Sequence, residues 1–137
     1  MHRFRAPPRD ELLERMCHGL GMGEDNPAVI VSPSMSGSFS VPLLLRKPSL
    51  FAGYVPVAPG VAKMYSAEDF EAVSGVPALI IYGEKDLMGG RVSTLLASIP
   101  GSKLVMIEGA THPAYLDEPE EFHSLFLDFL AGTVVFH

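Results

Sequence analysis

The sequence predicts a single domain, 1–137, of the α/β class, with a mostly parallel sheet and flanking helices. Two observations support this. The chain has 137 residues, 47% of them hydrophobic and 19% charged, which is one domain's worth of sequence with enough apolar residues for a packed core. Short apolar runs also alternate with segments of helical periodicity, an order that favours parallel strands joined by right-handed crossovers.

Four apolar runs are predicted to be strands. Each is too short for a helix and lacks polar alternation, as is typical of strands buried on both faces of a parallel sheet. The runs are Ala28 to Val31, Tyr54 to Ala58, Ala78 to Tyr82 and Leu104 to Ile107.

Helices are predicted before and between these runs. The first spans Asp10 to Leu20 and is followed by glycines that end it. Further helices are expected from Met35 to Leu45 and from Arg91 to Ser98, whereas a connection containing Ser, Glu and Asp precedes the third strand. In the first helix, four apolar residues form one stripe: Leu12, Leu13, Met16 and Leu20.

The last helix has the clearest amphipathic pattern. Its apolar residues follow i, i+3, i+4, i+7, i+8 spacing from Phe122 to Leu130. Asp117 and Glu120 resemble a capping box, and Pro119 suits a first turn. We therefore expect a helix that begins near Asp117, ends near Gly132 and packs one face on the sheet.

Charge and cysteine content exclude several classes of function. The formal net charge is −6, with 16 acidic against 10 basic residues, which disfavours nucleic acid and membrane surfaces as partners. Cys17 is the single cysteine, so no internal disulfide forms and a reducing compartment is expected. No apolar run is long enough for a membrane span, and a cytoplasmic location follows as an expectation.

Three residues at predicted strand ends could form one site. Ligands and catalytic groups of open α/β sheets gather beyond the carboxyl ends of the strands. Ser34 follows the first strand, Asp86 the third and His112 the fourth. This order of serine, acid and histidine is the one that an α/β-hydrolase triad uses.

Each of the three residues also has a simpler interpretation. Ser34 lies in a serine-rich turn that could be a loop or a helix cap, and Ser36 is the centre of a second possible register. Asp86 could simply be a turn-forming residue, and Glu84 competes with it as the acid. His112 could be an ordinary surface residue. The nucleophile interpretation needs small flanks around Ser34, which Ser32 and Ser36 supply without the usual glycines.

In the hydrolase interpretation the roles are defined. His112 removes the proton of Ser34, Ser34 attacks an acyl carbonyl, and Asp86 orients the imidazole. The backbone N–H of Met35 donates to the oxyanion, as the residue after the nucleophile does in this fold. No metal and no bound cofactor are expected.

Four segments resemble the α/β-hydrolase superfamily and, within it, the abhydrolase domain-containing protein 14 family. Together they cover residues 28–132, with overall similarity closer to member A and member B as the alternative. The segments are Val31-Ser-Pro-Ser-Met-Ser-Gly37, Gly53-Tyr-Val-Pro-Val-Ala-Pro59, Pro77-Ala-Leu-Ile-Ile-Tyr-Gly83 with Asp86, and His112-Pro-Ala-Tyr-Leu-Asp-Glu-Pro-Glu-Glu121.

The resemblance implies a serine hydrolase or acyltransferase. For member B it implies removal of acetyl groups from lysine, with coenzyme A as the acyl acceptor, so a small acyl compound or an acetylated lysine is the expected substrate. For member A it implies an amino-terminal membrane anchor in the full-length form, which no segment here matches.

One departure from the superfamily affects the expected activity. A complete domain places several strands before the nucleophile, and an early loop supplies a second oxyanion N–H, whereas about 27 residues precede the first predicted strand here. We therefore expect the carboxyl-terminal part of the domain, with the nucleophile strand at a sheet edge and turnover impaired roughly 100- to 1000-fold. The alternatives are an inactive splice or gene-model fragment that acts through protein contacts, and a binding module in which the three residues lie apart.

Overall fold

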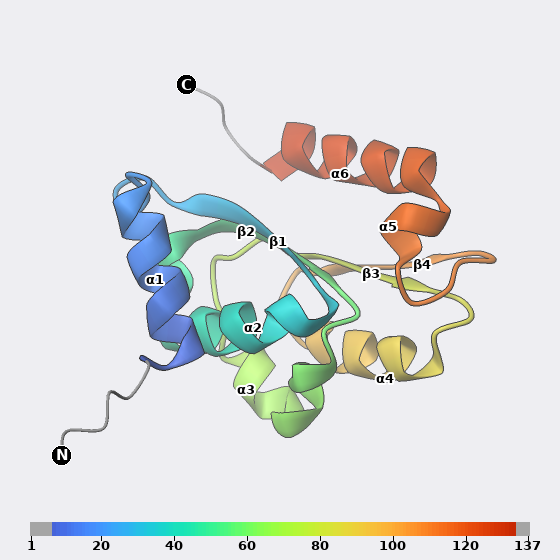
Figure 1. The fold of residues 1–137 in the computed structure, drawn as a ribbon, viewed down its shortest axis with the longest axis horizontal. Helices are drawn as coiled ribbons and strands as arrows, with labels where there is room; N and C mark the ends of the chain where they lie inside the picture. Colours follow the sequence, from blue (N-terminus) through green and yellow to red (C-terminus); the bar gives the residue numbers. More distant parts are fainter. Residues whose placement is uncertain (1–6, 134–137) are drawn as a thin grey trace, which may run out of the picture.

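The computed structural model describes residues 7–133, and Figure 1 shows a sheet between helices. The ends of the predicted domain, 1–6 and 134–137, lie outside the described residues, so a single domain over 1–137 stays a prediction. The strands are β1 (Ala28–Pro33), β2 (Phe51–Val57), β3 (Leu79–Gly83) and β4 (Lys103–Ile107). The α-helices are α1 (Arg9–Gly19), α2 (Gly37–Arg46), α3 (Ala67–Glu71), α4 (Leu87–Leu96), α5 (Ala114–Asp117) and α6 (Pro119–Thr133), and the 3-10 helices are η1 (Ser34–Ser36), η2 (Pro48–Leu50) and η3 (Gly60–Met64).

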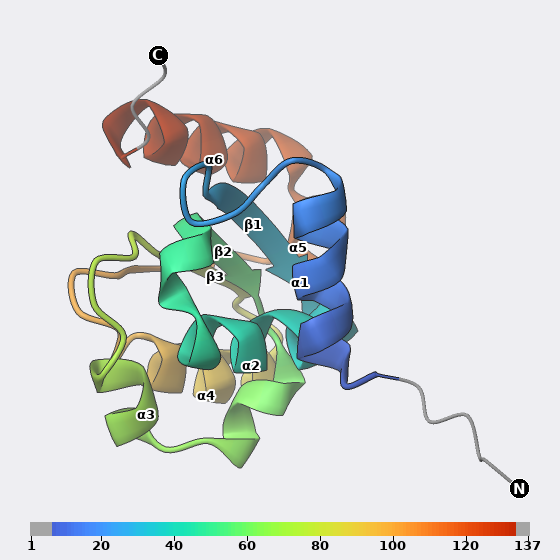
Figure 2. The same ribbon diagram turned by 90° about the vertical axis from the view of Figure 1, so that its left-hand side faces the viewer.

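All four strands are parallel and lie in the order β1-β2-β3-β4. This confirms the predicted α/β class and each predicted strand to within a few residues. Because right-handed crossovers that advance in one direction place their helices on one face of a sheet, α2, α3 and α4 lie together below the sheet, and α6 covers the opposite face (Figures 1 and 2).

Alternate residues of the central strands belong to two hydrophobic clusters, one on each face of the sheet. Tyr54 and Ile80 point into the cluster that α2, α3 and α4 cover. Val55, Leu79 and Ile81 point the other way and pack against the aromatic face of α6. The central strands are therefore buried on both faces, as their lack of polar alternation predicts.

The two outer strands are less buried than the prediction implies. Val105 of β4 packs on the α6 cluster, but Leu104 and Met106 on its other face are 40% and 45% exposed. β1 is also an edge strand, as predicted, and Val31 is 40% exposed. An apolar run marks a strand, but it does not reveal whether a neighbouring element covers both faces.

α1 forms where it is predicted, but its apolar stripe does not face the core. Leu12, Met16 and Leu20 are exposed, and Leu13 is the member of the stripe that packs against the core. Ion pairs also connect the helix to α2, since Arg46 contacts both Asp10 at 2.7 Å and Glu14 at 2.9 Å.

Three other local predictions need correction. α4 begins at Leu87, four residues earlier than predicted, because the Asp86 side chain caps it. The connection before β3 contains the short helix α3, which Ser66 and Asp69 start with a reciprocal capping box. Asp117 is the last residue of α5 and does not cap α6, which begins at Pro119.

Over residues 7–133, no helix combines the length and the apolar character that crossing a bilayer requires.

Candidate active site

A sharp turn joins β1 to the helix that follows it. β1 ends at Pro33, Ser34 opens η1, and α2 begins at Gly37. Ser34 has a φ of 49°, in the left-handed region where a side chain costs roughly 1–2 kcal/mol. Strain of this size persists only where surrounding contacts impose it, and it is typical of functional sites.

A chain of hydroxyl groups beneath the turn holds it in place. The Ser32 hydroxyl is hydrogen-bonded to those of Ser36, at 2.9 Å, and Ser40, at 2.6 Å. Ser40 is bonded in turn to the Tyr54 hydroxyl of β2, at 2.7 Å, and Ser36 donates to the carbonyl of Pro33, at 2.6 Å. The serines around Ser34 therefore connect the turn to the core, a function that their spacing alone did not reveal.

The structure brings Ser34, His112 and Asp86 into one hydrogen-bonded chain. The Ser34 hydroxyl lies 2.8 Å from Nε2 of His112. Nδ1 of the same ring lies 2.5 Å from Oδ2 of Asp86. These residues come from three loops at the carboxyl ends of β1, β3 and β4, where the sequence places them, so they do not lie apart as the binding-module alternative expects.

The two members of the His112–Asp86 pair differ in their exposure to solvent. The side chain of His112 is 50% exposed, whereas that of Asp86 is 10% exposed. The other carboxylate oxygen of Asp86 accepts a hydrogen bond from the backbone N–H of Gly89, at 2.9 Å. Asp86 is therefore fixed by α4, and it presents one oxygen to a ring that solvent and substrate can reach.

Two further contacts position the loop of His112. The carboxylate of Asp117 accepts hydrogen bonds from the backbone N–H of Thr111, at 2.7 Å, and from its hydroxyl, at 2.5 Å. These bonds hold the pKa of Asp117 below its usual value. Gly83 at the end of β3 lies so close to the carbonyl oxygens of Ala110 and Thr111 that a side chain would collide with them. Asp117 thus fixes the residue next to His112, which the sequence analysis missed because it assigned Asp117 to a helix cap.

The competing residues of the sequence analysis lie elsewhere. Ser36 points into the hydroxyl chain under the turn, away from the imidazole. The carboxylate of Glu84 accepts from the backbone N–H of Gly109. Neither makes a hydrogen bond to His112.

The turn also provides an electrostatic environment for a negative charge. Met35 is the second residue of η1, where a backbone N–H has no partner within the helix. η1 continues directly into α2, so the positive end of the helix dipole lies next to Ser34. The N–H of Met35 could therefore donate to an oxyanion that forms on a carbonyl attacked by Ser34.

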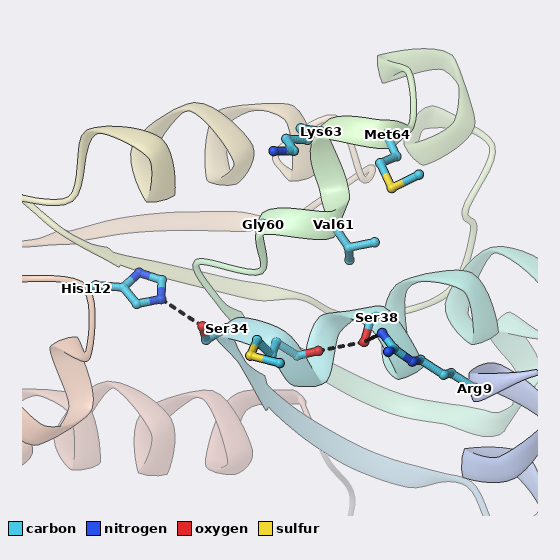
Figure 3. Close-up of a pocket in the computed structure, with 9 residues that line it drawn as sticks. Arg9, Ser34, Ser38, Gly60, Val61, Lys63, Met64 and His112 are labelled. Atoms are coloured by element: carbon cyan, nitrogen blue, oxygen red, sulfur yellow. Dashed lines mark hydrogen bonds between the residues drawn. The ribbon is translucent and has the colours of Figure 1, made fainter.

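A pocket of about 430 Å³ opens over Ser34 and His112. Figure 3 shows the side chains that line it, with Ser34 and His112 joined by a hydrogen bond. Arg9 of α1 and Lys63 of η3 supply two positive charges. The apolar part of the wall consists of Met35, Val61 and Met64. The sequence gives no local signal for Arg9 or Lys63, because both reach the pocket only through the packing of distant segments.

Known proteins of similar sequence align with most of this chain. ABHD14B of Pongo abelii, named as a candidate protein-lysine deacylase, is 44% identical over 109 residues, which are 80% of this chain and 51% of that protein. Human ABHD14A is 41% identical over 123 residues, which are 89% of this chain and 44% of that protein. The chain therefore spans about half the length of the curated relatives it matches. No family model matches the chain.

Solved structures show the same fold. A predicted CIB-like hydrolase from Thermoplasma acidophilum superposes with a TM-score of 0.78 at 28% identity, over 90% of this chain and 58% of that chain. The carboxylesterase CesB from Bacillus subtilis superposes with a TM-score of 0.75 at 17% identity, over 92% of this chain and 66% of that chain. The four-stranded sheet and its helices thus match part of an α/β-hydrolase fold.

Proposed function

Because this chain is a homologue of the ABHD14 proteins and has part of the α/β-hydrolase fold, we propose that it is a serine-dependent acyl hydrolase or acyltransferase. The observation that supports this most is the hydrogen-bonded chain from Ser34 through His112 to Asp86. The strained backbone of Ser34 is a second, independent support.

The proposed mechanism assigns one task to each residue. With the ring proton on Nδ1 and directed at Asp86, Nε2 of His112 accepts the Ser34 proton as the hydroxyl attacks the acyl carbonyl. Asp86 stabilises the imidazolium that results, and the N–H of Met35 donates to the oxyanion. His112 then protonates the leaving group, and an acceptor removes the acyl group from Ser34.

The substrate class follows from the relatives. We propose an acylated lysine as the acyl donor, since ABHD14B is named as a candidate protein-lysine deacylase. Water is the simplest acceptor, and coenzyme A is the alternative that the resemblance implies. The half-exposed ring of His112 leaves the acylated serine accessible to an acceptor from solvent.

Covalent labelling tests the assignment directly. A fluorophosphonate probe is expected to label the wild-type chain at Ser34 and to leave Ser34→Ala unlabelled. Ser36→Ala and Ser38→Ala are matched controls, because each removes a neighbouring hydroxyl that does not contact His112, and both should still be labelled. Labelling that survives in Ser34→Ala but is lost in Ser36→Ala would show that Ser36, the centre of the second register, is the nucleophile.

A second candidate function is a role through protein contacts without turnover. β1 favours it, because this strand lies at the sheet edge and Val31 is 40% exposed on its face, which are features that a bound partner could cover. The two candidates differ in one result. A sample that unfolds cooperatively but never reacts with the probe would support the contact role and exclude the hydrolase.

A further inference from the structure

The pocket beside Ser34 is positively charged in a protein that is negatively charged overall. The chain has a formal net charge of −6, yet the charged groups on the pocket wall are Arg9 and Lys63. Within residues 7–133, no acidic side chain lines this pocket, and neither Arg9 nor Lys63 is within salt-bridge distance of a carboxylate. Both cations are thus available to a ligand.

Arg9 is held in position although it forms no ion pair with any residue from 7 to 133. One guanidinium nitrogen donates to the Ser38 hydroxyl at 3.0 Å, and the guanidinium lies 5.7 Å from the centre of the Phe39 ring. A guanidinium has five N–H donors, so several remain for a ligand. Ser38 in turn donates to the carbonyl of Met35 at 2.7 Å, which connects Arg9 to the residue that follows Ser34.

The rest of the wall suits an aliphatic chain. Met35 and Met64 are 83% and 77% exposed, and methionine is a flexible apolar surface that adapts to ligand shape. The pocket therefore combines a nucleophile, an apolar surface and two cations. A ligand that complements all three has a carbonyl, an aliphatic spacer and an anion.

We propose that this pocket selects acyl groups that end in a carboxylate, as in the half-esters or half-amides of aliphatic dicarboxylic acids, with Lys63 and Arg9 binding the carboxylate. This inference rests on the proposed function, since it assigns the substrate class of the same site. It goes further in placing the anion on the acyl group and not on the leaving group.

Matched esters test the selectivity. The substrates are mono-4-nitrophenyl adipate and 4-nitrophenyl hexanoate, which share a six-carbon acyl chain and differ in the terminal carboxylate. The readout is the ratio of their kcat/KM values, because the neutral ester corrects for any effect on Ser34 itself. We expect the ratio to fall about 1.5- to fivefold in Lys63→Gln and in Arg9→Gln, as is usual for exposed charge pairs, and to fall further in Lys63→Glu.

Arg91→Gln is the matched control. It removes the same charge, but Arg91 lines a separate cavity between α4 and β4, so its ratio should equal that of the wild type. A third substrate, the hexanoate ester of 3-carboxy-4-nitrophenol, carries its anion on the leaving group. If the Lys63 and Arg9 variants lower the rate of this ester but not that of the adipate ester, the acyl assignment is wrong.

A binding measurement keeps the two proposals separate. Monomethyl adipate should bind to Ser34→Ala, with chemical-shift changes at the pocket, and bind about 1.5- to fivefold more weakly when Lys63→Gln is added. Ser34-dependent hydrolysis of the hexanoate with an unchanged ratio would overturn the carboxylate inference and leave the hydrolase standing. Absence of all hydrolysis together with Lys63-dependent binding would overturn the proposed hydrolase activity and leave the carboxylate inference standing.

Discussion

The strain at Ser34 predicts that glycine at this position gives a more stable protein than alanine. Ser34 has a φ of 49°, which glycine adopts without steric cost but alanine does not. Ser34→Gly and Ser34→Ala both lose the hydrogen bond to His112. The difference between the two variants therefore isolates the backbone conformation of the turn.

The expected size follows from two opposing effects. The left-handed conformation costs a residue with a Cβ atom roughly 1–2 kcal/mol. Glycine loses more backbone entropy on folding, which offsets about 0.5–1 kcal/mol of that gain. Ser34→Gly should therefore have a free energy of unfolding about 0.5–1 kcal/mol above that of Ser34→Ala, or a melting temperature higher by roughly 2–5 °C.

Urea denaturation of both variants measures this difference, provided that their m-values agree. Ser38 supplies the control, since it lies in α2 and its φ is not positive. There the order should invert, with Ser38→Gly less stable than Ser38→Ala by about 0.5–1 kcal/mol. If Ser34→Gly is no more stable than Ser34→Ala, the turn relaxes freely and the surroundings do not impose its strain.

Three further predictions follow from the hydrogen-bond and charge networks. Ser40→Ala should lower the free energy of unfolding, measured in urea, by about 1 kcal/mol more than Tyr54→Phe. It removes the Ser40 hydroxyl that is hydrogen-bonded to the buried Tyr54 hydroxyl, whereas Tyr54→Phe leaves Ser40 bonded to Ser32. Hydrogen bonds and ion pairs with Lys47 and Arg46 hold the pKa of Glu14 at about 2, against 4.5 for an unperturbed glutamate. The free energy of unfolding of the wild type should therefore exceed that of Glu14→Gln by a constant amount above pH 5. This difference should decline as the pH falls from 4.5 to 2. Asp117→Asn should lower kcat/KM for a neutral ester roughly tenfold, because it loosens Thr111 next to His112. This is less than the ~100-fold that a 1 Å misplacement can cost. An unchanged rate would show that the His112 loop keeps its position without this carboxylate.

The sequence predicts the strands and their ends well, because both depend on local composition. An apolar run such as Ala78 to Tyr82 is recognisable whatever surrounds it, and the fold requires the residues that follow parallel strands to meet at one edge. The positions of Ser34, Asp86 and His112 could be predicted for this reason. Their mutual distances could not, since these depend on close packing such as that of Gly83 against the His112 loop.

Features that depend on neighbouring elements were predicted poorly. The stripe of α1 has correct helical spacing, but the side of the helix that meets α2 carries Leu13 and the two acidic residues paired with Arg46, so Met16 and Leu20 are exposed. Arg9 lies far from Ser34 in the sequence and reaches the same pocket because α1 packs on α2. A single charged residue has no periodic pattern in the sequence that would mark it as part of a pocket, and only the folded structure shows where it lies.

Asp86 shows that a structural and a functional interpretation of one residue need not exclude each other. From the sequence, a turn-forming aspartate and a partner of the imidazole are alternatives. In the structure one carboxylate oxygen caps α4 through Gly89, and the other meets His112. The cap fixes the orientation of the carboxylate and thereby directs the second oxygen at the ring. The local propensity that makes aspartate a good helix cap is thus part of what places the proposed catalytic acid.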